Sequence, residues 1–268
     1  MRILYLKNRR KPDRLLDHMV ASEFSAMLHE KRPELILTSG GDGTVLETFF
    51  EMEQQGFGDI PVMAKENGRV SFLGTNFVYE DASTQEAVHG RSLKALAKMP
   101  KPPHLFSFNP VEIWINGIKR GSAINDAIIG REINDFHCFE ISSEDGFFEK
   151  FVFYGMGIGI ATIIGSTGFN FNNGGRIVYE QDFWNVFSIV AQAHINDILR
   201  AQTITIRILD DRKPVYLYVD GSVQIEALHL HDEITLRRSQ QKKHLSFLRK
   251  GEFLTKRKEY LHSIRKKM

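Results

Sequence analysis

Apolar and polar positions along the first hundred residues predict strands and helices in turn. Short apolar runs predict strands at residues 1–6, 35–39 and 61–65. Helices are expected at residues 13–30 and 45–55, and at about 83–98, where Ser83 and Glu86 form a capping box. Strands that alternate with helices pair in a parallel sheet with helices on its faces, so we expect an α/β domain here.

The pattern changes after Lys101-Pro102-Pro103, where apolar residues begin to alternate with a period of two. Residues 111–115, 203–209 and 215–219 show this alternation, and Asn116-Gly117 is a strong hairpin turn. Antiparallel β structure is therefore expected from about residue 104 to 240. Phe147, Phe148, Phe151 and Phe153 alternate in the same way, which favours a core or a subunit contact over a cofactor site.

The end of the chain combines an apolar stripe with a strong positive charge. Residues 237–268 hold 12 Lys or Arg against 2 Asp or Glu, a net +10, while the rest of the chain carries −8. Such a tail can bind nucleic acid or an anionic membrane, but its apolar stripe favours a docked helix with a solvated basic face. The fold expected is an α/β domain at 1–103, a β-rich domain at 104–244, and a basic helix at 245–268 that returns to the first domain.

Composition excludes several classes of protein. The chain has 268 residues, of which 42% are hydrophobic and 25% charged, values typical of a globular protein with a real core. No apolar run approaches the roughly 20 residues of a membrane span, and no ribonucleoprotein motif is present. The single cysteine, Cys138, excludes internal disulfides and indicates a reducing, cytoplasmic location. Neither nucleic acid nor a membrane is expected as a partner.

A glycine-rich turn at residues 39–44 is the first candidate for chemistry. Gly40, Gly41 and Gly43 can present backbone amides to a phosphate, and the helix expected behind them adds partial positive charge. The carboxylate of Asp42 repels phosphate, so it suits proton removal from an attacking hydroxyl or help in holding a metal ion. The structural alternative is that Asp42 is simply the N-cap of the helix. No Lys follows the glycines, so the turn is not a Walker loop.

Further motifs give the turn a family context. Gly-Gly-Asp-Gly-Thr after a strand resembles the signature shared by NAD kinases with diacylglycerol and sphingosine kinases. Other segments resemble the NAD kinase pattern in family order: residues 67–73, Asn125-Asp126, the run from Gly165 to Phe169 with Gly174-Gly175 beyond it, and Asp220-Gly221. The sequence therefore resembles the NAD kinase family from about residue 35 to 225.

The resemblance implies a two-domain enzyme that transfers a phosphoryl group from ATP or polyphosphate to the 2′-hydroxyl of the adenosine ribose of NAD, with a divalent metal, Mg²⁺. It implies Asp42 as proton acceptor, the turn glycines at the donor phosphates, and ribose hydroxyls held by Asn125 and Asp126. No residue is assigned as a metal ligand, and homodimers or homotetramers are implied. The remaining residues expected to bind substrate or nucleotide are Thr44, Asn67, Gly68, Thr167, Gly168, Phe169, Asn170, Asn172 and Ala191.

Five positions depart from the family pattern and keep alternatives open. Asp126 replaces a Glu, and Gly168-Phe169 replaces Ala-Tyr. Met156 replaces an acid that contacts the nicotinamide end of NAD, which favours altered substrate binding over lost catalysis. Glu66 replaces an Asn, and it could repel the donor or ligate Mg²⁺. The alternatives are a lipid or sphingoid kinase that shares the glycine-rich turn, and a nucleotide-sensing relative without turnover.

Overall fold

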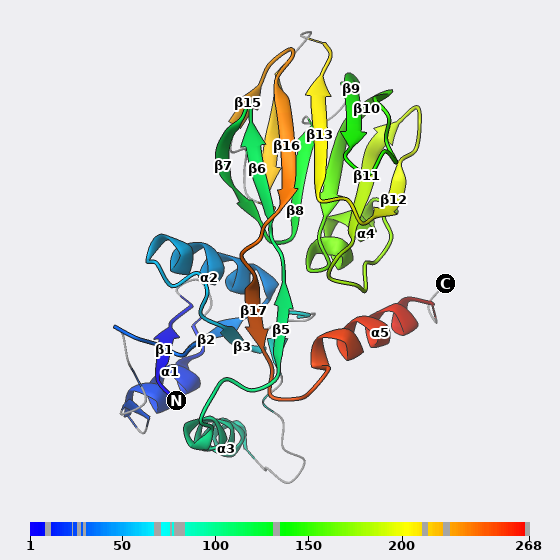
Figure 1. Ribbon diagram of the computed structural model, residues 1–268. Coiled ribbons are helices and arrows are strands. Elements are labelled where there is room, and N and C mark those ends of the chain that lie inside the picture. The colour runs from blue at the N-terminus through cyan, green and yellow to red at the C-terminus, as the bar shows by residue number, and fades with distance from the viewer. Residues whose placement is uncertain are drawn as a thin grey trace. The chain divides into compact units, whose positions relative to one another are not determined.

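The computed structural model forms two compact units (Figure 1). Unit 1 comprises Met1–Ser107 with Lys243–Met268, and unit 2 comprises Phe108–Lys242. The residues described are 1–8, 12–22, 24–25, 28, 31–66, 71–75, 77, 84–130, 135–210, 214–221 and 226–265.

Unit 1 is an α/β structure built on a sheet in the order β1-β2-β3-β17-β5, with β4 paired to β3. The pairs β1–β2, β2–β3, β3–β4 and β3–β17 are parallel. Its elements are β1 (Ile3–Leu6), α1 (Arg14–Ser22), β2 (Leu35–Gly40), α2 (Asp42–Gln54), β3 (Val62–Glu66), β4 (Gly74–Thr75), α3 (Gln85–Lys98), β5 (Leu105–Phe108), β17 (Lys243–Ser246) and α5 (Glu252–Arg265). Every residue of β2 is buried, as expected for a central strand of a parallel sheet.

Helix α1 is shorter than the apolar spacing predicts. Asp13 caps its start, where the Leu16 amide donates to the carboxylate at 3.1 Å. The helix ends at Ser22 instead of continuing to residue 30. The Phe24 amide donates to the carbonyl of Met19, five residues back, a bond typical of a helix that closes at its C-terminal end. Leu28 instead forms an isolated parallel bridge with Ile3.

The chain returns to unit 1 as a strand before it becomes a helix. The expected helix from residue 245 was wrong at its start, because β17 occupies Lys243–Ser246 and pairs with β3. Leu245 and Phe247 are buried on either side of Ser246, so this stretch is enclosed by its neighbours. Helix α5 then begins at Glu252 and packs Phe253 against Phe106 and Phe247.

Unit 2 is an antiparallel sheet in the order β15-β14-β8-β10-β9-β13-β16-β6-β7, extended from β10 through β11 to β12. Its elements are β6 (Val111–Ile115), β7 (Ile118–Ala123), β8 (Asp126–Gly130), β9 (His137–Ser143), β10 (Phe151–Ala161), η2 (Gly165–Thr167), α4 (Phe169–Asn172), β11 (Trp184–Ala191), β12 (Asn196–Leu199), β13 (Thr203–Ile208), β14 (Val215–Val219), β15 (Glu226–Leu228) and β16 (Glu233–Arg238). The β6–β7 hairpin turns at Asn116 and Gly117, which have φ of 50° and 78°.

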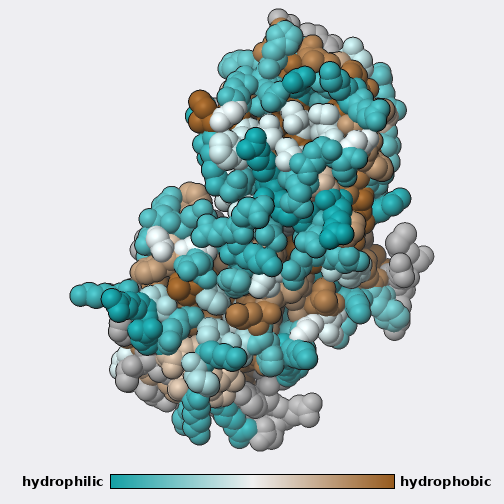
Figure 2. Space-filling model, viewed as in Figure 1, coloured by the Kyte–Doolittle hydropathy of each residue, from teal (hydrophilic) through white to brown (hydrophobic). Residues whose placement is uncertain are grey.

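The alternating strands of unit 2 bury one side and expose the other. Inward residues such as Ile113, Ile204 and Leu217 form a single core. Outward positions carry charge: Arg207 on β13 pairs with Glu140 on β9 and Glu233 on β16. Figure 2 shows a largely hydrophilic surface over this part of the molecule. Of the Phe stripe, Phe148 and Phe153 are in the core, whereas Phe147 and Phe151 are exposed.

The strand and helix content therefore gives the α/β N-terminal part and the β-rich remainder that the sequence predicts. No helix in the described ranges is long and apolar enough to span a bilayer.

Candidate functional site

The glycine-rich turn joins β2 directly to α2. Gly41 is the N-cap of α2, with φ −90° and ψ −172°. As a glycine it has no side chain, so the helix start has no side-chain cap. The helix therefore begins at Asp42, three residues earlier than expected, and the interpretation of Asp42 as the N-cap was wrong. The first amides of a helix lack partners within the helix, so the turn presents N–H groups and partial positive charge at its open end.

The three glycines serve different purposes. A Cβ on Gly40 would lie 2.2 Å from Thr44 Oγ1 and 2.9 Å from Asn8 Nδ2, so only glycine lets the strand end approach the helix here. At Gly41 and Gly43 a Cβ would meet nothing within 4 Å. None of the three has a positive φ, so the freedom of glycine in the left-handed region is not used. Open space beside Gly41 and Gly43 leaves their backbone accessible to a ligand.

The carboxylate of Asp42 points away from its own helix to the segment before β4. It accepts hydrogen bonds from Leu73 N at 2.9 Å, Phe72 N at 3.0 Å and Ser71 Oγ at 3.2 Å. Burial raises the pKa of Asp42, while these three donors and the charge of Lys256 oppose the rise. The result is an oriented carboxylate whose pKa is shifted toward neutrality, the property expected of a general base.

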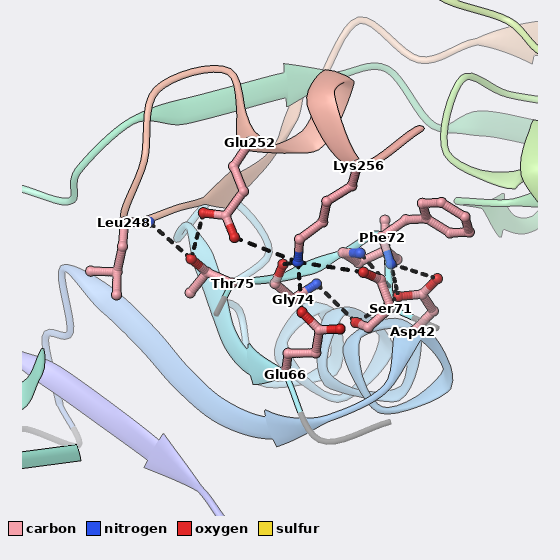
Figure 3. A network of polar contacts seen from close by, with 10 residues as sticks. Asp42, Glu66, Ser71, Phe72, Gly74, Thr75, Leu248, Glu252 and Lys256 are labelled. Atoms are coloured by element: carbon pink, nitrogen blue, oxygen red, sulfur yellow. Dashed lines mark hydrogen bonds and ion pairs between the residues drawn. The ribbon is translucent and has the colours of Figure 1, made fainter. Parts of the chain in front are cut away.

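A polar network from α5 surrounds that segment (Figure 3). Lys256 Nζ lies 2.8 Å from Glu66 Oε2 and donates to the Gly74 carbonyl at 2.7 Å. Thr75 Oγ1 donates to Glu252 Oε2 at 2.7 Å and accepts from the Leu248 amide at 3.1 Å. Glu66 is therefore engaged in an ion pair, with its side chain 18% exposed.

A second candidate site is a pocket of about 530 Å³ in unit 2. Carboxylates lie in it beside apolar side chains, a composition typical of small-molecule sites. It is lined by Asn125, Asp126, Ile128, Gly130, Met156, Phe169, Ile189, Tyr218, Asp220 and Gly221.

Two aspartates dominate the electrostatics of this pocket. Asp220 accepts hydrogen bonds from the amides of Ile124, Asn125 and Asp126, between 2.6 and 3.2 Å. Burial raises its pKa to about 6. Burial and the neighbouring charge of Asp220 raise the pKa of Asp126 to about 7. Both groups are thus poised to accept or donate hydrogen bonds to hydroxyls near neutral pH.

The segment of residues 162–169, which contains the Gly165–Phe169 run, holds the Asn125-Asp126 backbone in place. Thr162 donates from its hydroxyl to the Ile124 carbonyl at 2.5 Å and from its amide to the Asn125 carbonyl at 2.9 Å. A Cβ on Gly165 would lie 2.2 Å from that Asn125 oxygen, so the motif glycine is required by close packing. The motif therefore shapes the pocket through its backbone.

The structure separates the predicted residues of this segment. Phe169 is 44% exposed and lines the pocket, whereas Thr167 is buried. Asn170 is fully buried, because it donates to the carbonyls of Ser166 and Arg176 and accepts from Asn185. Gly168 and the exposed Asn172 lie outside the set of residues that lines the pocket.

Four further residues were predicted to bind substrate or nucleotide: Thr44, Asn67, Gly68 and Ala191. Ala191 pairs with Gly155 across β10 and β11, beside the pocket-lining Ile189 but not itself part of the lining. Thr44 uses its hydroxyl to accept from Asn8 Nδ2 at 2.9 Å. Asn67 and Gly68 lie outside the described residues.

Sequence reasoning did not assign some residues of the two sites. Asp220 had a signal, because Asp-Gly follows an alternating strand and resembles a family motif. Ile128, Ile189 and Tyr218 had no such signal. In the sequence, an apolar or aromatic residue of a strand looks the same whether it packs in the core or lines a pocket. Lys256 was read only as part of a basic helix face.

Searches with family models gave no match to the chain. Among individual proteins, an NAD kinase of Methanospirillum hungatei is 29% identical over 233 residues, covering 83% of this chain and 77% of that protein. An NAD kinase of Methanothermobacter thermautotrophicus is 27% identical over 254 residues, covering 92% of this chain and 80% of that protein.

Solved structures share the fold. Yeast NADH kinase complexed with NADH superposes with a TM-score of 0.72 at 17% identity, covering 98% of this chain and 88% of that chain. An NAD kinase from Archaeoglobus fulgidus in complex with ATP gives 0.64 at 18% identity, covering 94% and 95%.

The α/β part and the β-rich part of this chain thus have the fold of these two structures. The sequence similarity to NAD kinases covers most of the chain. The resemblance to the NAD kinase family that the motifs indicate is therefore confirmed, and the chain is a relative of the NAD kinases.

Proposed function

We propose that this protein is an NAD kinase that transfers the terminal phosphoryl group of ATP to the 2′-hydroxyl of the adenosine ribose of NAD. The products are NADP and ADP, and the hydroxyl proton leaves to a protein carboxylate. The observation that carries the proposal is the Asp42 carboxylate, which accepts hydrogen bonds from three donors. It lies at the start of a helix, where a phosphate can bind, and the chain's relatives are NAD kinases.

Asp42 is the proton acceptor in this proposal. Its three hydrogen bonds fix the carboxylate in one orientation, and its raised pKa gives it more affinity for a proton than an exposed aspartate has. As the hydroxyl oxygen bonds to phosphorus, its proton passes to Asp42, and the bond between the transferred phosphorus and the ADP oxygen breaks. Phosphoryl transfer depends mainly on positioning and charge stabilisation, so one base and a phosphate cradle suffice.

The start of α2 receives the donor phosphates. Gly41 and Gly43 leave open space beside the backbone, and the helix adds partial positive charge there. ATP is the donor favoured, because the related A. fulgidus structure holds ATP. Polyphosphate is the alternative donor.

The pocket of unit 2 binds the dinucleotide. Asp126 and Asp220 provide acceptors for ribose hydroxyls, and Asn125 adds a side-chain amide at the same place. Phe169 offers an exposed ring for stacking on a base. Met156 makes the lining around it apolar where the family carries an acid, which alters how the far end of the substrate is held.

The residues that the structure describes do not form a metal centre built by the protein alone. Within the described ranges, no group of three or more His, Cys, Asp or Glu side chains could hold a metal ion. Asp42 is bound by amides and a hydroxyl, and Glu66 is paired with Lys256. Mg²⁺ therefore enters with the phosphates of ATP, as part of the substrate.

The protein is proposed to be a cytoplasmic homo-oligomer. Exposed aromatics at Phe147, Phe151 and Tyr154 support a homodimer or homotetramer. The free, buried Cys138 suits a reducing, cytoplasmic setting. The domain limits proposed are those of the two units, 1–107 with 243–268 and 108–242, in place of the expected 1–103, 104–244 and 245–268.

Two alternatives give different products. A lipid or sphingoid kinase would share the glycine-rich turn, and a nucleotide-sensing relative would bind NAD without turnover. Neither is favoured by the named relatives, which are NAD kinases.

Labelled ATP separates the three possibilities. The protein is incubated with [γ-³²P]ATP, Mg²⁺ and, in turn, NAD, NADH, a sphingoid base or diacylglycerol. We expect label in a dinucleotide product only. Label in a lipid would support the first alternative, and NAD binding without any labelled product would support the second.

A further inference from the structure

Lys256 is the centre of the polar network between α5 and the strands of unit 1 (Figure 3). Its ammonium group lies 2.8 Å from Glu66 Oε2 and 3.5 Å from Glu252 Oε1. It also donates to two backbone carbonyls, at 2.7 Å to Gly74 and 3.4 Å to Ser71. The side chain is only 16% exposed, so these contacts are made in a place that water reaches poorly.

The two carbonyls that Lys256 contacts flank the amides that hold Asp42. Phe72 and Leu73 donate to the Asp42 carboxylate, and Ser71 donates its hydroxyl. One short segment thus has its carbonyls turned to Lys256 and its amides turned to Asp42. The same helix packs the ring of Tyr260 edge-on to Phe72, with centroids 5.1 Å apart.

Charge gives Lys256 a second role at the same place. Glu66 ends β3 and introduces a carboxylate beside the segment that holds Asp42. Among the described residues, the groups that face the Asp42 carboxylate are Lys256 from α5 and the Ser71 hydroxyl with the two amides. The cation therefore compensates Glu66 and Glu252 and favours the ionised form of Asp42.

We propose that Lys256 is a positioning residue for the phosphoryl transfer: it holds the 71–75 segment against Asp42 and balances the charge of Glu66. Helix α5 then serves the reaction, and not only the stability of unit 1. The proposal rests on the proposed function of Asp42 as proton acceptor.

Three variants and a matched control test this role. Lys256→Met should lower kcat by about tenfold or more, because the base is less well placed, while KM for NAD changes less than about twofold. The acidic limb of the kcat–pH profile should move up by about one pH unit, since loss of a nearby cation raises the pKa of Asp42. Lys256→Arg should retain most activity. Glu66→Gln combined with Lys256→Met should return the acidic limb toward the wild-type position, because the unpaired carboxylate is removed.

Lys258→Met is the matched control, because it removes the same charge from an exposed position of the same helix. It should leave kcat and the pH profile unchanged. A folded Lys256→Met protein with wild-type kcat and an unmoved acidic limb would overturn the proposal.

A readout without turnover separates this proposal from the proposed function. In wild type and Lys256→Met, amide exchange at Phe72 and Leu73 and the ¹³C-NMR titration of the Asp42 carboxyl are compared. Faster exchange and a raised Asp42 pKa in the variant support the positioning role even if no NADP is formed, a result that would refute only the proposed function. Unchanged exchange and titration would refute the positioning role even if the wild type is an active kinase.

Discussion

Asp42 is held by three donors from one segment, so its environment predicts the effect of a single substitution. In Asp42→Asn the amide oxygen still accepts from that segment, and the fold should be kept. The side chain no longer takes a proton, so kcat should fall by about 10²–10⁴-fold. Steady-state kinetics with ATP and NAD measure this loss.

Asp59→Asn provides the control, because Asp59 is an exposed aspartate of the same unit. Near-normal turnover by a fully folded Asp42→Asn protein would show that Asp42 is only structural.

Asp126 and Asp220 predict how stability depends on pH. Their folded pKa values of about 7 and about 6 lie above the ordinary 3.8, so between these limits the folded state binds more protons than the unfolded state. Their contribution to the free energy of unfolding is fully present below pH 3.8 and is lost as pH rises through 6 to 7.

Thermal unfolding followed from pH 4 to 8 tests this dependence. Asp126→Asn removes one of the two titrations, so the melting temperature of the variant should rise relative to wild type as pH increases. Identical pH dependence in wild type and variant would contradict the assignment of raised pKa values to this pair.

At the scale of elements, the segment of residues 162–169 packs closely against Asn125 through one glycine, Gly165. A Cβ on Gly165 would lie within 2.2–2.7 Å of backbone atoms of Asn125, and the backbone has to move to accept it. We expect Gly165→Ala to destabilise unit 2 by about 2 kcal/mol or more and to weaken NAD binding, because Asn125 and Asp126 shift.

Chemical denaturation and NAD titration measure the two effects. Gly121→Ala on β7 is the control, because a Cβ there meets nothing within 4 Å. Equal stability of the two variants would mean that the close approach at Gly165 is not a constraint.

The sequence predicted those elements whose pattern is local. The strand at 111–115, the Asn116-Gly117 turn and the strand–glycine–helix order around Asp42 all follow from residues near each other in the chain. The end of α1 at Ser22 and the strand β17 did not follow, because each depends on partners distant in sequence.

In the two candidate sites, too, residues in local motifs could be predicted, and contacts between distant residues could not. Asp42, Asn125 and Asp126 could be predicted as site residues because each belongs to a short contiguous motif. The pairing of Glu66 with Lys256 joins residues 190 positions apart, and no local pattern predicts it. Sequence alone left open whether Glu66 would repel the donor or bind a metal; its carboxylate instead meets a cation.

At the scale of the whole molecule, exposed aromatics predict self-association. Phe147 is 56% exposed, Phe151 40% and Tyr154 45%, all in or beside β10 of unit 2. Light scattering should give a mass that is a multiple of 30.8 kDa, and Phe151→Ser should shift it toward the monomer. A wild-type protein of 30.8 kDa at all concentrations would refute the oligomer.

The whole protein is expected to make NADP. The most direct measurement incubates the wild-type protein with NAD, ATP and Mg²⁺ and detects the product with a dehydrogenase that accepts only NADP. We predict NADP formation that depends on both substrates and is lost in Asp42→Asn. No NADP from the folded wild-type protein, with NAD or NADH and with ATP or polyphosphate, would contradict the assignment as an NAD kinase.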